Sequence, residues 1–428
     1  MPKVTIIGGG WAGCAAAVGA VKAGAKVTIL ERTDMLLGTG LVGGIMRNNG
    51  RFTATEEMIA MGGGDLFEIC DNTSRHKNIN FPGHNHVNLY DIAEIHGAVF
   101  SHLHKLGVEI IFEARIEKVT MDDKTILSVQ DQKERIFTGD VYIDTTGTAG
   151  PINNCNKYGN GCAMCVLRCP SFGGRLSLGA LVGVSEMVGI KPDGSIGAMS
   201  GSCKLLKESL SIEIQQLLTR EGVAIIAIPE ELAENHLDIK ACQQYALPDF
   251  KDNIILLDTG HAKLMAPYFN LERLRKIPGL ENARYEDPYT GGIGNSMRFF
   301  NMSPRDNYLQ VEGINNLFCA GEKAGLLVGH TEAIVTGVLA GNNSVRFALN
   351  KPMIQLPTEL AIGDAIAYVK EAMNTQDGMS KKYTFSGSAY FDRMRELGLY
   401  MTNVLDIHSK VESLGFKNIF NQNITDNA

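Results

Sequence analysis

The sequence predicts an α/β protein, in which a Rossmann-like nucleotide-binding domain is interrupted by an inserted α+β substrate domain and followed by a helical C-terminal region. Three observations lead to this fold class: a β–loop–helix–β pattern begins the chain, a strand–turn–helix pattern returns near residue 316, and the residues between follow neither pattern. The 428 residues suffice for about two or three domains. We therefore predict a discontinuous nucleotide-binding domain at 1–150 and 301–350, an inserted domain at 151–300, and a mainly helical region at 351–428.

The first pattern contains a dinucleotide-binding fingerprint. It consists of an apolar strand at 3–7, the glycines Gly8, Gly10 and Gly13, an alanine-rich helix at 14–24, a second strand at 26–30, and the acid Glu31. The first glycine permits a tight turn, the second lets the backbone approach a pyrophosphate, and the third lets helix and strand pack closely. The N–H groups at the start of the helix suit phosphate, and the carboxylate after the second strand suits a ribose hydroxyl.

The other predicted elements follow in order along the chain. They are a glycine-rich stretch at 36–64, a helix at 89–106, a strand at 108–112, a meander at 116–137, a strand at 141–144 before a turn with Gly147, a helix at 202–221, strands at 223–228 and 253–258, a strand and turn at 316–322, and a helix from Thr331 to Ala348. The glycine-rich stretch would let backbone lie against a flat ligand. Its alternative interpretation is a flexible loop.

Four cysteines begin the predicted insertion: Cys155, Cys162, Cys165 and Cys169, with Pro170 directly after the last. The end of this run, Cys-x2-Cys-x3-Cys-Pro, resembles part of a bacterial ferredoxin motif, and four thiolates can hold a [4Fe–4S] cluster. An iron–sulfur cluster is therefore our preferred interpretation. A redox dithiol of Cys162 and Cys165, a structural zinc site, and a set of unrelated buried cysteines are the alternatives.

Together, the fingerprint and the late segment resemble the flavoproteins with the glutathione-reductase type of FAD fold. The late segment, Leu317–Glu322 followed by Gly329–Ala333 and Gly337–Gly341, resembles the closing flavin motif of the GidA-like flavoproteins, which include folate- and FAD-dependent RNA uridine methyltransferases. The resemblance implies that N–H groups of the helix at Thr331 face the flavin ring. It further implies FAD bound by Gly8, Gly10, Gly13, Glu31, Gly147, Gly321 and Glu322.

One departure from this group concerns methyl transfer. The methyltransferases carry a cysteine in an Asn- and Ser-rich motif soon after the second strand. Residues 45–51 of this chain contain no cysteine, and the nearest one downstream is Cys70. Methyl transfer to RNA is therefore not the preferred interpretation.

Three side chains are candidates for catalysis. His330 precedes the helix that would face the flavin, so it is placed to move a substrate proton. Arg298 and Arg305 lie in a polar stretch before the strand at 316, where the fork of an arginine could bind an anionic substrate. An ordinary surface position is the alternative for each arginine.

Composition limits the partners. The net charge of −7 argues against nucleic acid as a partner without excluding it. No apolar run is long enough to cross a bilayer, and no signal peptide is recognisable. We expect a cytoplasmic homo-oligomer without a membrane partner.

The preferred hypothesis is an FAD-dependent oxidoreductase acting on a small-molecule substrate. In it, a [4Fe–4S] cluster relays single electrons between the flavin and an electron-transfer protein. The alternatives are a GidA-like RNA-modifying flavoprotein of the uridine methyltransferase type, a flavin and dithiol redox protein without a cluster, and a sensor that turns over no small substrate.

Overall fold

A five-stranded parallel sheet forms the centre of the nucleotide-binding part. The computed structural model describes residues 1–148, 169–191, 193–196, 198–199, 203–233, 252–265, 269–286, 297–298 and 300–425. In spatial order, the strands are β19 (Leu317–Cys319), β10 (Val141–Asp144), β1 (Lys3–Ile7), β2 (Lys26–Leu30) and β6 (Glu109–Ile111). All four pairings are parallel, so the carboxyl ends of the strands meet at one edge. The late strand β19 pairs with β10 and thereby joins two distant parts of the chain.

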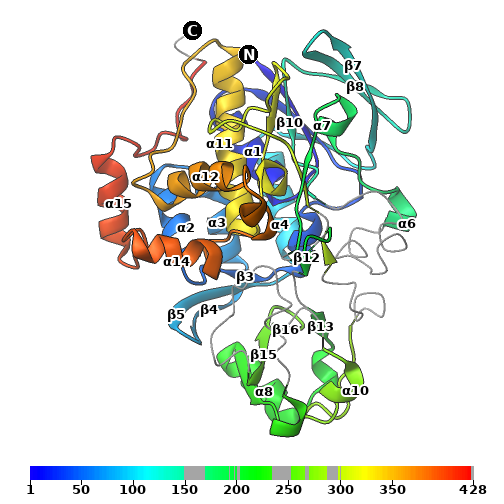
Figure 1. The fold of residues 1–428 in the computed structure, drawn as a ribbon, viewed down its shortest axis with the longest axis vertical. Coiled ribbons are helices and arrows are strands. Elements are labelled where there is room, and N and C mark those ends of the chain that lie inside the picture. The colour runs from blue at the N-terminus through cyan, green and yellow to red at the C-terminus, as the bar shows by residue number, and fades with distance from the viewer. Residues whose placement is uncertain are drawn as a thin grey trace.

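Two helices lie side by side and cover this sheet (Figure 1). They are α1 (Trp11–Lys22) and α11 (His330–Ala348). Glycines bring their backbones into contact: a Cβ on Gly337 would lie 2.4 Å from the carbonyl oxygen of Ala12, and one on Gly341 would lie 2.1 Å from that of Ala16. These contacts advance in the same direction along both helices, which therefore run parallel and begin at the same edge of the sheet.

A smaller three-stranded sheet packs beside the parallel one. Its strands are β3 (Ile45–Met46), β4 (Ser74–Phe81) and β5 (His84–Tyr90). The nearby helices are η1 (Gly38–Val42), α2 (Arg51–Ala60), α3 (Asp65–Asn72) and α4 (Ile95–Lys105). The predicted helix at 89–106 is wrong at its start, because residues up to Tyr90 pair with both β3 and β4. The expected meander is present as β7 (Ile116–Asp122), β8 (Thr125–Asp131) and β9 (Ile136–Thr138).

The inserted segment builds a sheet of its own, at the lower end of Figure 1. Its antiparallel strands, in the order β13–β16–β15–β14, are β13 (Cys203–Leu205), β14 (Val223–Ala227), β15 (Asn253–Asp258) and β16 (Ala262–Leu264). Helix α8 (Ile212–Glu221) packs on it with a side-chain cap from Ser211. The predicted helix at 202–221 therefore begins too early, because residues 203–205 form a strand.

Short elements complete this part of the chain. They are α6 (Cys169–Phe172), α7 (Leu178–Leu181), β11 (Met187–Val188), β12 (Ala198–Met199), η3 (Lys207–Ser209), η4 (Glu230–Leu232), α10 (Leu271–Leu274), β17 (Met297–Arg298), β18 (Asn301–Met302) and η6 (Gly321–Ala324). Two antiparallel ladders, β11 with β18 and β12 with β17, connect the two ends of the insertion. The predicted domain boundaries at 150, 300 and 350 stay predictions.

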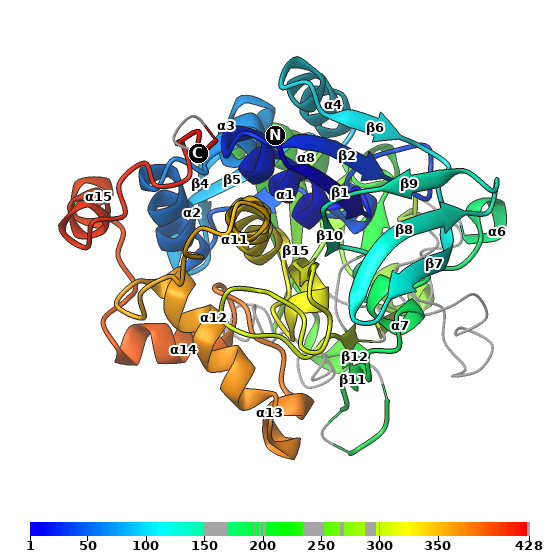
Figure 2. The same cartoon turned by 90° about the horizontal axis from the view of Figure 1, so that it is seen from above.

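The chain ends in four helices that lie along one flank of the molecule (Figure 2). They are α12 (Ala361–Ala372), α13 (Gln376–Ser380), α14 (Ser388–Glu396) and α15 (Val404–Ser413). The predicted fold class, including this helical C-terminal region, is confirmed. Among the described residues, no helix combines the length and the apolar character needed to cross a membrane.

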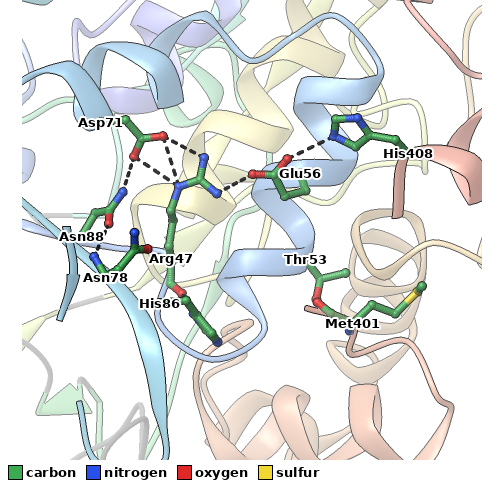
Figure 3. Close-up of polar contacts among 9 residues, drawn as sticks. All are labelled: Arg47, Thr53, Glu56, Asp71, Asn78, His86, Asn88, Met401 and His408. Carbon is green, nitrogen blue, oxygen red and sulfur yellow. Dashed lines mark hydrogen bonds and ion pairs between the residues drawn. The ribbon is translucent and has the colours of Figure 1, made fainter. Parts of the chain in front are cut away.

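An ion-pair network fixes the last helix to the body of the protein (Figure 3). The guanidinium of Arg47 bridges Asp71, at 2.7 Å, and Glu56. The other oxygen of Glu56 lies 3.0 Å from Nε2 of His408 on α15. Hydrogen bonds between Thr53 and the backbone of Met401 add a second link. The C-terminal region is thereby attached to α2.

The contact between α1 and α11 predicts a stability difference between two glycine substitutions. G341A would press a methyl group on the carbonyl of Ala16, so we expect it to lower the free energy of unfolding by about 1–3 kcal/mol. G97A is the control: Gly97 is an exposed residue of α4, and a Cβ there would meet nothing within 4 Å. It should be neutral or slightly stabilising, by up to about 1 kcal/mol. Urea denaturation measures both, and equal stability of the two variants would contradict the close packing.

Candidate functional site

A cavity opens at the carboxyl edge of the parallel sheet. Of the eight residues predicted to bind a cofactor, six line it: Gly8, Gly10, Glu31, Gly147, Gly321 and Glu322. The loops that follow β1, β2, β10 and β19 contribute these residues, so the strand ends meet here as the parallel register requires. The empty space is about 1500 Å³, its open mouth included.

The three fingerprint glycines have three different surroundings. Gly8 has φ +104°, and a Cβ there would lie 2.6 Å from the carbonyl oxygen of Thr145. A Cβ on Gly13 would lie 1.9 Å from the carbonyl oxygen of Gly8, so Gly13 lets helix α1 approach strand β1. A Cβ on Gly10 would meet nothing within 4 Å. Gly10 therefore faces the open cavity at the start of α1, where the N–H groups of the first turn have no partner within the helix.

Cationic side chains surround one end of the cavity, next to Glu31. Its carboxylate accepts hydrogen bonds from the backbone N–H of Gly9, at 2.6 Å, and from that of Thr33, at 2.8 Å. Arg32, Arg115 and Arg175 line the same end. None of these arginines was singled out by the sequence analysis.

The segment 173–175, Gly-Gly-Arg, holds two of these arginines and contributes the third. Arg32 donates to the carbonyl of Gly173, and Arg115 donates to that of Gly174 at 2.6 Å. The guanidinium of Arg175 lies against Gly147, where a Cβ would be 2.6 Å from its Nη1. This segment thus forms one wall of the cavity and brings a third positive charge to it.

The other end of the cavity is built around Gly43. A Cβ on Gly43 would lie 1.8 Å from Cε1 of His330 and 2.6 Å from the hydroxyl of Tyr90. The Tyr90 hydroxyl donates to the carbonyl of Gly40 at 2.8 Å and lies 3.3 Å from Nδ1 of His330. Burial raises the pKa of Tyr90, so its hydroxyl stays protonated. The predicted candidate His330 therefore lies at the cavity, at the first residue of α11.

A lysine from the insertion reaches this same end. Lys263 on β16 lines the cavity, and its Nζ donates to the carbonyl oxygens of Val42, at 2.9 Å, and Gly43, at 2.6 Å. Sequence reasoning missed it. The available signal was a charged residue inside the apolar run of β16, which indicates burial but names no partner.

The hairpin that carries Lys263 is fixed by a buried carboxylate. Asp258, which ends β15, contacts His76 at 3.0 Å, Lys207 at 2.5 Å and Arg75 at 3.3 Å. Burial alone would raise the pKa of Asp258, but hydrogen bonds from His76 and Lys207, with the charges of Lys207 and Arg75, hold it well below its usual value. These contacts attach the inserted sheet to β4.

The remaining predicted residues have other surroundings. Thr331 is fully buried in the first turn of α11, beside the cavity. Arg305 lies away from the cavity lining, is 3% exposed, and donates to the carbonyl oxygens of Ala324 and Ile366, each at 2.8 Å. Its fork is thus used by the backbone, which corrects the predicted anion-binding role. Arg298 belongs to β17, and its side chain is not among those described.

The predicted cluster ligands Cys155, Cys162 and Cys165 lie outside the described residues, and Cys169 is described only in its backbone. Within the described ranges, no group of three or more His, Cys, Asp or Glu residues is arranged to hold a metal ion. The other cysteines in these ranges, Cys14, Cys70, Cys203 and Cys319, are buried and form no disulfide. Burial raises the pKa of Cys70 well above its ordinary value, which disfavours the thiolate.

The comparisons with known proteins agree with this architecture. A profile of the family described as glucose inhibited division protein A matches residues 3–247 and 259–352. The solved structure of GidA from Aquifex aeolicus in its form II crystal superposes with a TM-score of 0.66 at 17% identity, covering 96% of this chain and 76% of that one. The form I crystal gives a TM-score of 0.61 at 16% identity, with 96% and 78% coverage. At such identities the likeness concerns the fold.

Curated relatives match over a shorter stretch. The methylenetetrahydrofolate–tRNA-(uracil-5-)-methyltransferase TrmFO of Thermosipho melanesiensis is 35% identical over 101 residues, 22% of each chain. TrmFO of Listeria monocytogenes serovar 1/2a is 37% identical over 101 residues, 22% of this chain and 21% of that protein. The matched stretch thus spans about a fifth of these relatives.

The Asp258 contacts predict a pH-dependent loss of stability. Because the folded protein holds the pKa of this carboxyl low, its stabilising contribution is complete above the unfolded pKa of about 4 and is lost as the pH falls further. At pH 7, D258N should lower the free energy of unfolding by about 2–4 kcal/mol. The difference from wild type should shrink toward about pH 3. Asp123, exposed in a turn, gives the control D123N. Equal effects of the two variants in denaturation curves at pH 7 would refute the role of Asp258.

Proposed function

Because the chain belongs to the glucose inhibited division protein A family, we propose that it is an FAD-dependent enzyme that modifies tRNA. One observation supports the cofactor above all. The N-termini of α1 and α11 and the carboxylate of Glu31 surround a single cavity at the carboxyl edge of a parallel sheet. A long ligand with a ribose, two phosphates and a flat ring would have a partner for each of these three groups: the Glu31 carboxylate, the N-terminus of α1 and the N-terminus of α11.

The residues present fit FAD along the whole cavity. Glu31 would accept hydrogen bonds from the adenosine ribose. The open space at Gly10 suits the pyrophosphate, because the first turn of α1 offers N–H donors there and Arg175 adds a positive charge beside Gly147. The flat flavin ring would then lie at the Gly43 end, against the first turn of α11.

When bound, FAD supplies hydride or two-electron transfer. The chain's own contribution at that end is proton handling by His330. Since the Tyr90 proton is donated to the carbonyl of Gly40, the Tyr90 oxygen accepts from Nδ1–H of His330. Nε2 of His330 then carries the lone pair that can accept a proton from a substrate.

The relatives support tRNA as the substrate, and the cysteines of this chain limit which reaction on tRNA can be proposed. The curated relatives are named for a reaction on a uracil of tRNA. The chain lacks a cysteine at 45–51, and Cys70 is fully buried with a raised pKa. We therefore propose a redox modification of a tRNA base in which no cysteine between residues 45 and 70 acts as the nucleophile.

The cofactor proposal predicts a selective effect of G10A. A methyl group on Gly10 would meet no protein atom within 4 Å but would occupy the space given to the pyrophosphate. We expect a folded protein whose affinity for FAD is at least about tenfold weaker, measured by absorbance during titration of the apoprotein with FAD. G97A, at an exposed position of α4 that does not line the cavity, should bind FAD as the wild type does. Wild-type affinity in G10A, or no FAD binding by the wild type, would refute the assignment.

The substrate proposal predicts salt-dependent binding of tRNA. For an unmodified tRNA transcript, the logarithm of the affinity should fall linearly with the logarithm of the salt concentration. Incubating the FAD-loaded protein with this transcript and NADH or NADPH, with and without methylenetetrahydrofolate, should change the mass of one uridine after nuclease digestion. The G10A variant should lose this activity and keep tRNA binding. Absence of both binding and a mass change would refute tRNA as the substrate.

A second candidate is an FAD-dependent oxidoreductase with a [4Fe–4S] cluster, favoured by the cysteine spacing alone. The comparisons give it no support. The same purified protein decides between the two: about four iron and four acid-labile sulfide per chain, lost in C162S and C165S, would favour this candidate. Flavin without iron or sulfide after anaerobic reconstitution would remove it.

A further inference from the structure

The inserted sheet is built into the wall of the cavity through one hairpin. Between β15 and β16 the chain turns at Thr259, whose carbonyl accepts a hydrogen bond from the backbone N–H of Ile92 at 3.2 Å. A Cβ on Gly44 would lie 2.3 Å from the methyl group of Thr259. Gly44 also has φ +92°, a backbone conformation that favours glycine. Position 44 therefore requires glycine both for its backbone conformation and for the close approach of Thr259. The turn is therefore in fixed contact with the 42–45 loop.

This contact holds Lys263 in one place. The side chain is 5% exposed, although a lysine is almost never buried without a specific reason. Its Nζ donates to two successive carbonyl oxygens, those of Val42 and Gly43, at 2.9 and 2.6 Å. These two carbonyl oxygens fix the position of the ammonium group. The insertion thus places a cation against the 42–45 loop of the nucleotide-binding part.

Lys263 lies close to the N-terminus of α11. Gly43, which accepts the hydrogen bond from Lys263, is in contact with His330 at the start of α11. The N-terminus of a helix carries a partial positive charge. Lys263 and the first turn of α11 therefore meet at one end of the cavity, and the same end is left for the flavin ring once Glu31 takes the ribose.

Building on the proposed FAD site, we propose that Lys263 is a fixed cation that stabilises the negative charge gained by the flavin ring on reduction. Two electrons and one proton convert the neutral oxidised ring into its anionic reduced form, so one negative charge is added. A nearby positive charge in a buried site lowers the free energy of that form relative to the oxidised one. The α+β insertion would then set the reactivity of the cofactor as well as the shape of the site.

The test compares a neutral and a charged replacement. K263Q keeps a donor for the carbonyl oxygens but loses the charge, and K263R keeps the charge. The matched control is K382Q: Lys382 is 1% exposed and donates to the carbonyl oxygens of Ile190 and Lys381, but it does not line the cavity. Each FAD-loaded protein is titrated with sulfite, which adds to the oxidised ring and leaves a negative charge on it. The midpoint potential is measured by reduction with dithionite against reference dyes.

We expect K263Q to bind sulfite at least about tenfold more weakly than wild type and to have a lower midpoint potential. K263R and K382Q should stay close to wild type. FAD content is measured separately, so a wild-type protein without FAD refutes the cofactor proposal and not the role of Lys263. Wild-type sulfite affinity in FAD-loaded K263Q overturns the inference. If K263Q fails to hold FAD, K263R decides: wild-type sulfite affinity supports the inference, and a tenfold loss overturns it.

Discussion

The backbone contact between α1 and α11 is the constraint on which the site depends. Two helices can bring their backbones into contact only where no side chain stands between them. Gly337 and Gly341 meet this condition, because a Cβ on either would lie within 2.4 Å of a carbonyl oxygen of α1. The contact fixes the two helices in parallel, and the parallel sheet fixes their starting points. As a consequence, the first-turn N–H groups of two helices, which have no partner within their own helix, and two positive dipole ends reach one cavity, although the helices lie more than three hundred residues apart in the sequence.

Positive charge accumulates around this cavity. Arg32, Arg115 and Arg175 line one end, and Lys263 lines the other. Among the described residues, only two carboxylates, those of Glu31 and Glu322, line the same cavity, so cationic side chains outnumber acidic ones in its wall. A dinucleotide with two phosphates between the two ends would be attracted by this excess of positive charge. The electrostatics of the wall and the helix geometry therefore favour the same kind of ligand.

The sequence predicted the elements whose signals are local and missed the features that depend on distant contacts. Gly8, Gly10, Gly13 and Glu31 are found from a single β–loop–helix–β segment, because the pattern that contains them is continuous in the sequence. The helix predicted at 89–106 included the last two residues of the strand that ends at Tyr90, since the pairing of this strand with residues 45–46 and 74–81 cannot be read from its own composition. The role given to Arg305 failed for a related reason. A lone arginine in a polar stretch gives no sign that backbone carbonyl groups surround its fork.

Lys263 is the clearest case of a residue placed by remote interactions. Its hairpin is held at one side by Asp258, whose buried carboxylate contacts Arg75 and His76 of β4 and Lys207 of η3. It is held at the other side by the close approach of Thr259 to Gly44. Neither contact involves the cavity, yet together they determine where the ammonium group lies. A change at the base of the inserted sheet would therefore move a charge at the Gly43 end of the cavity. For this reason the insertion is better regarded as part of the cavity wall than as a separate cover for it.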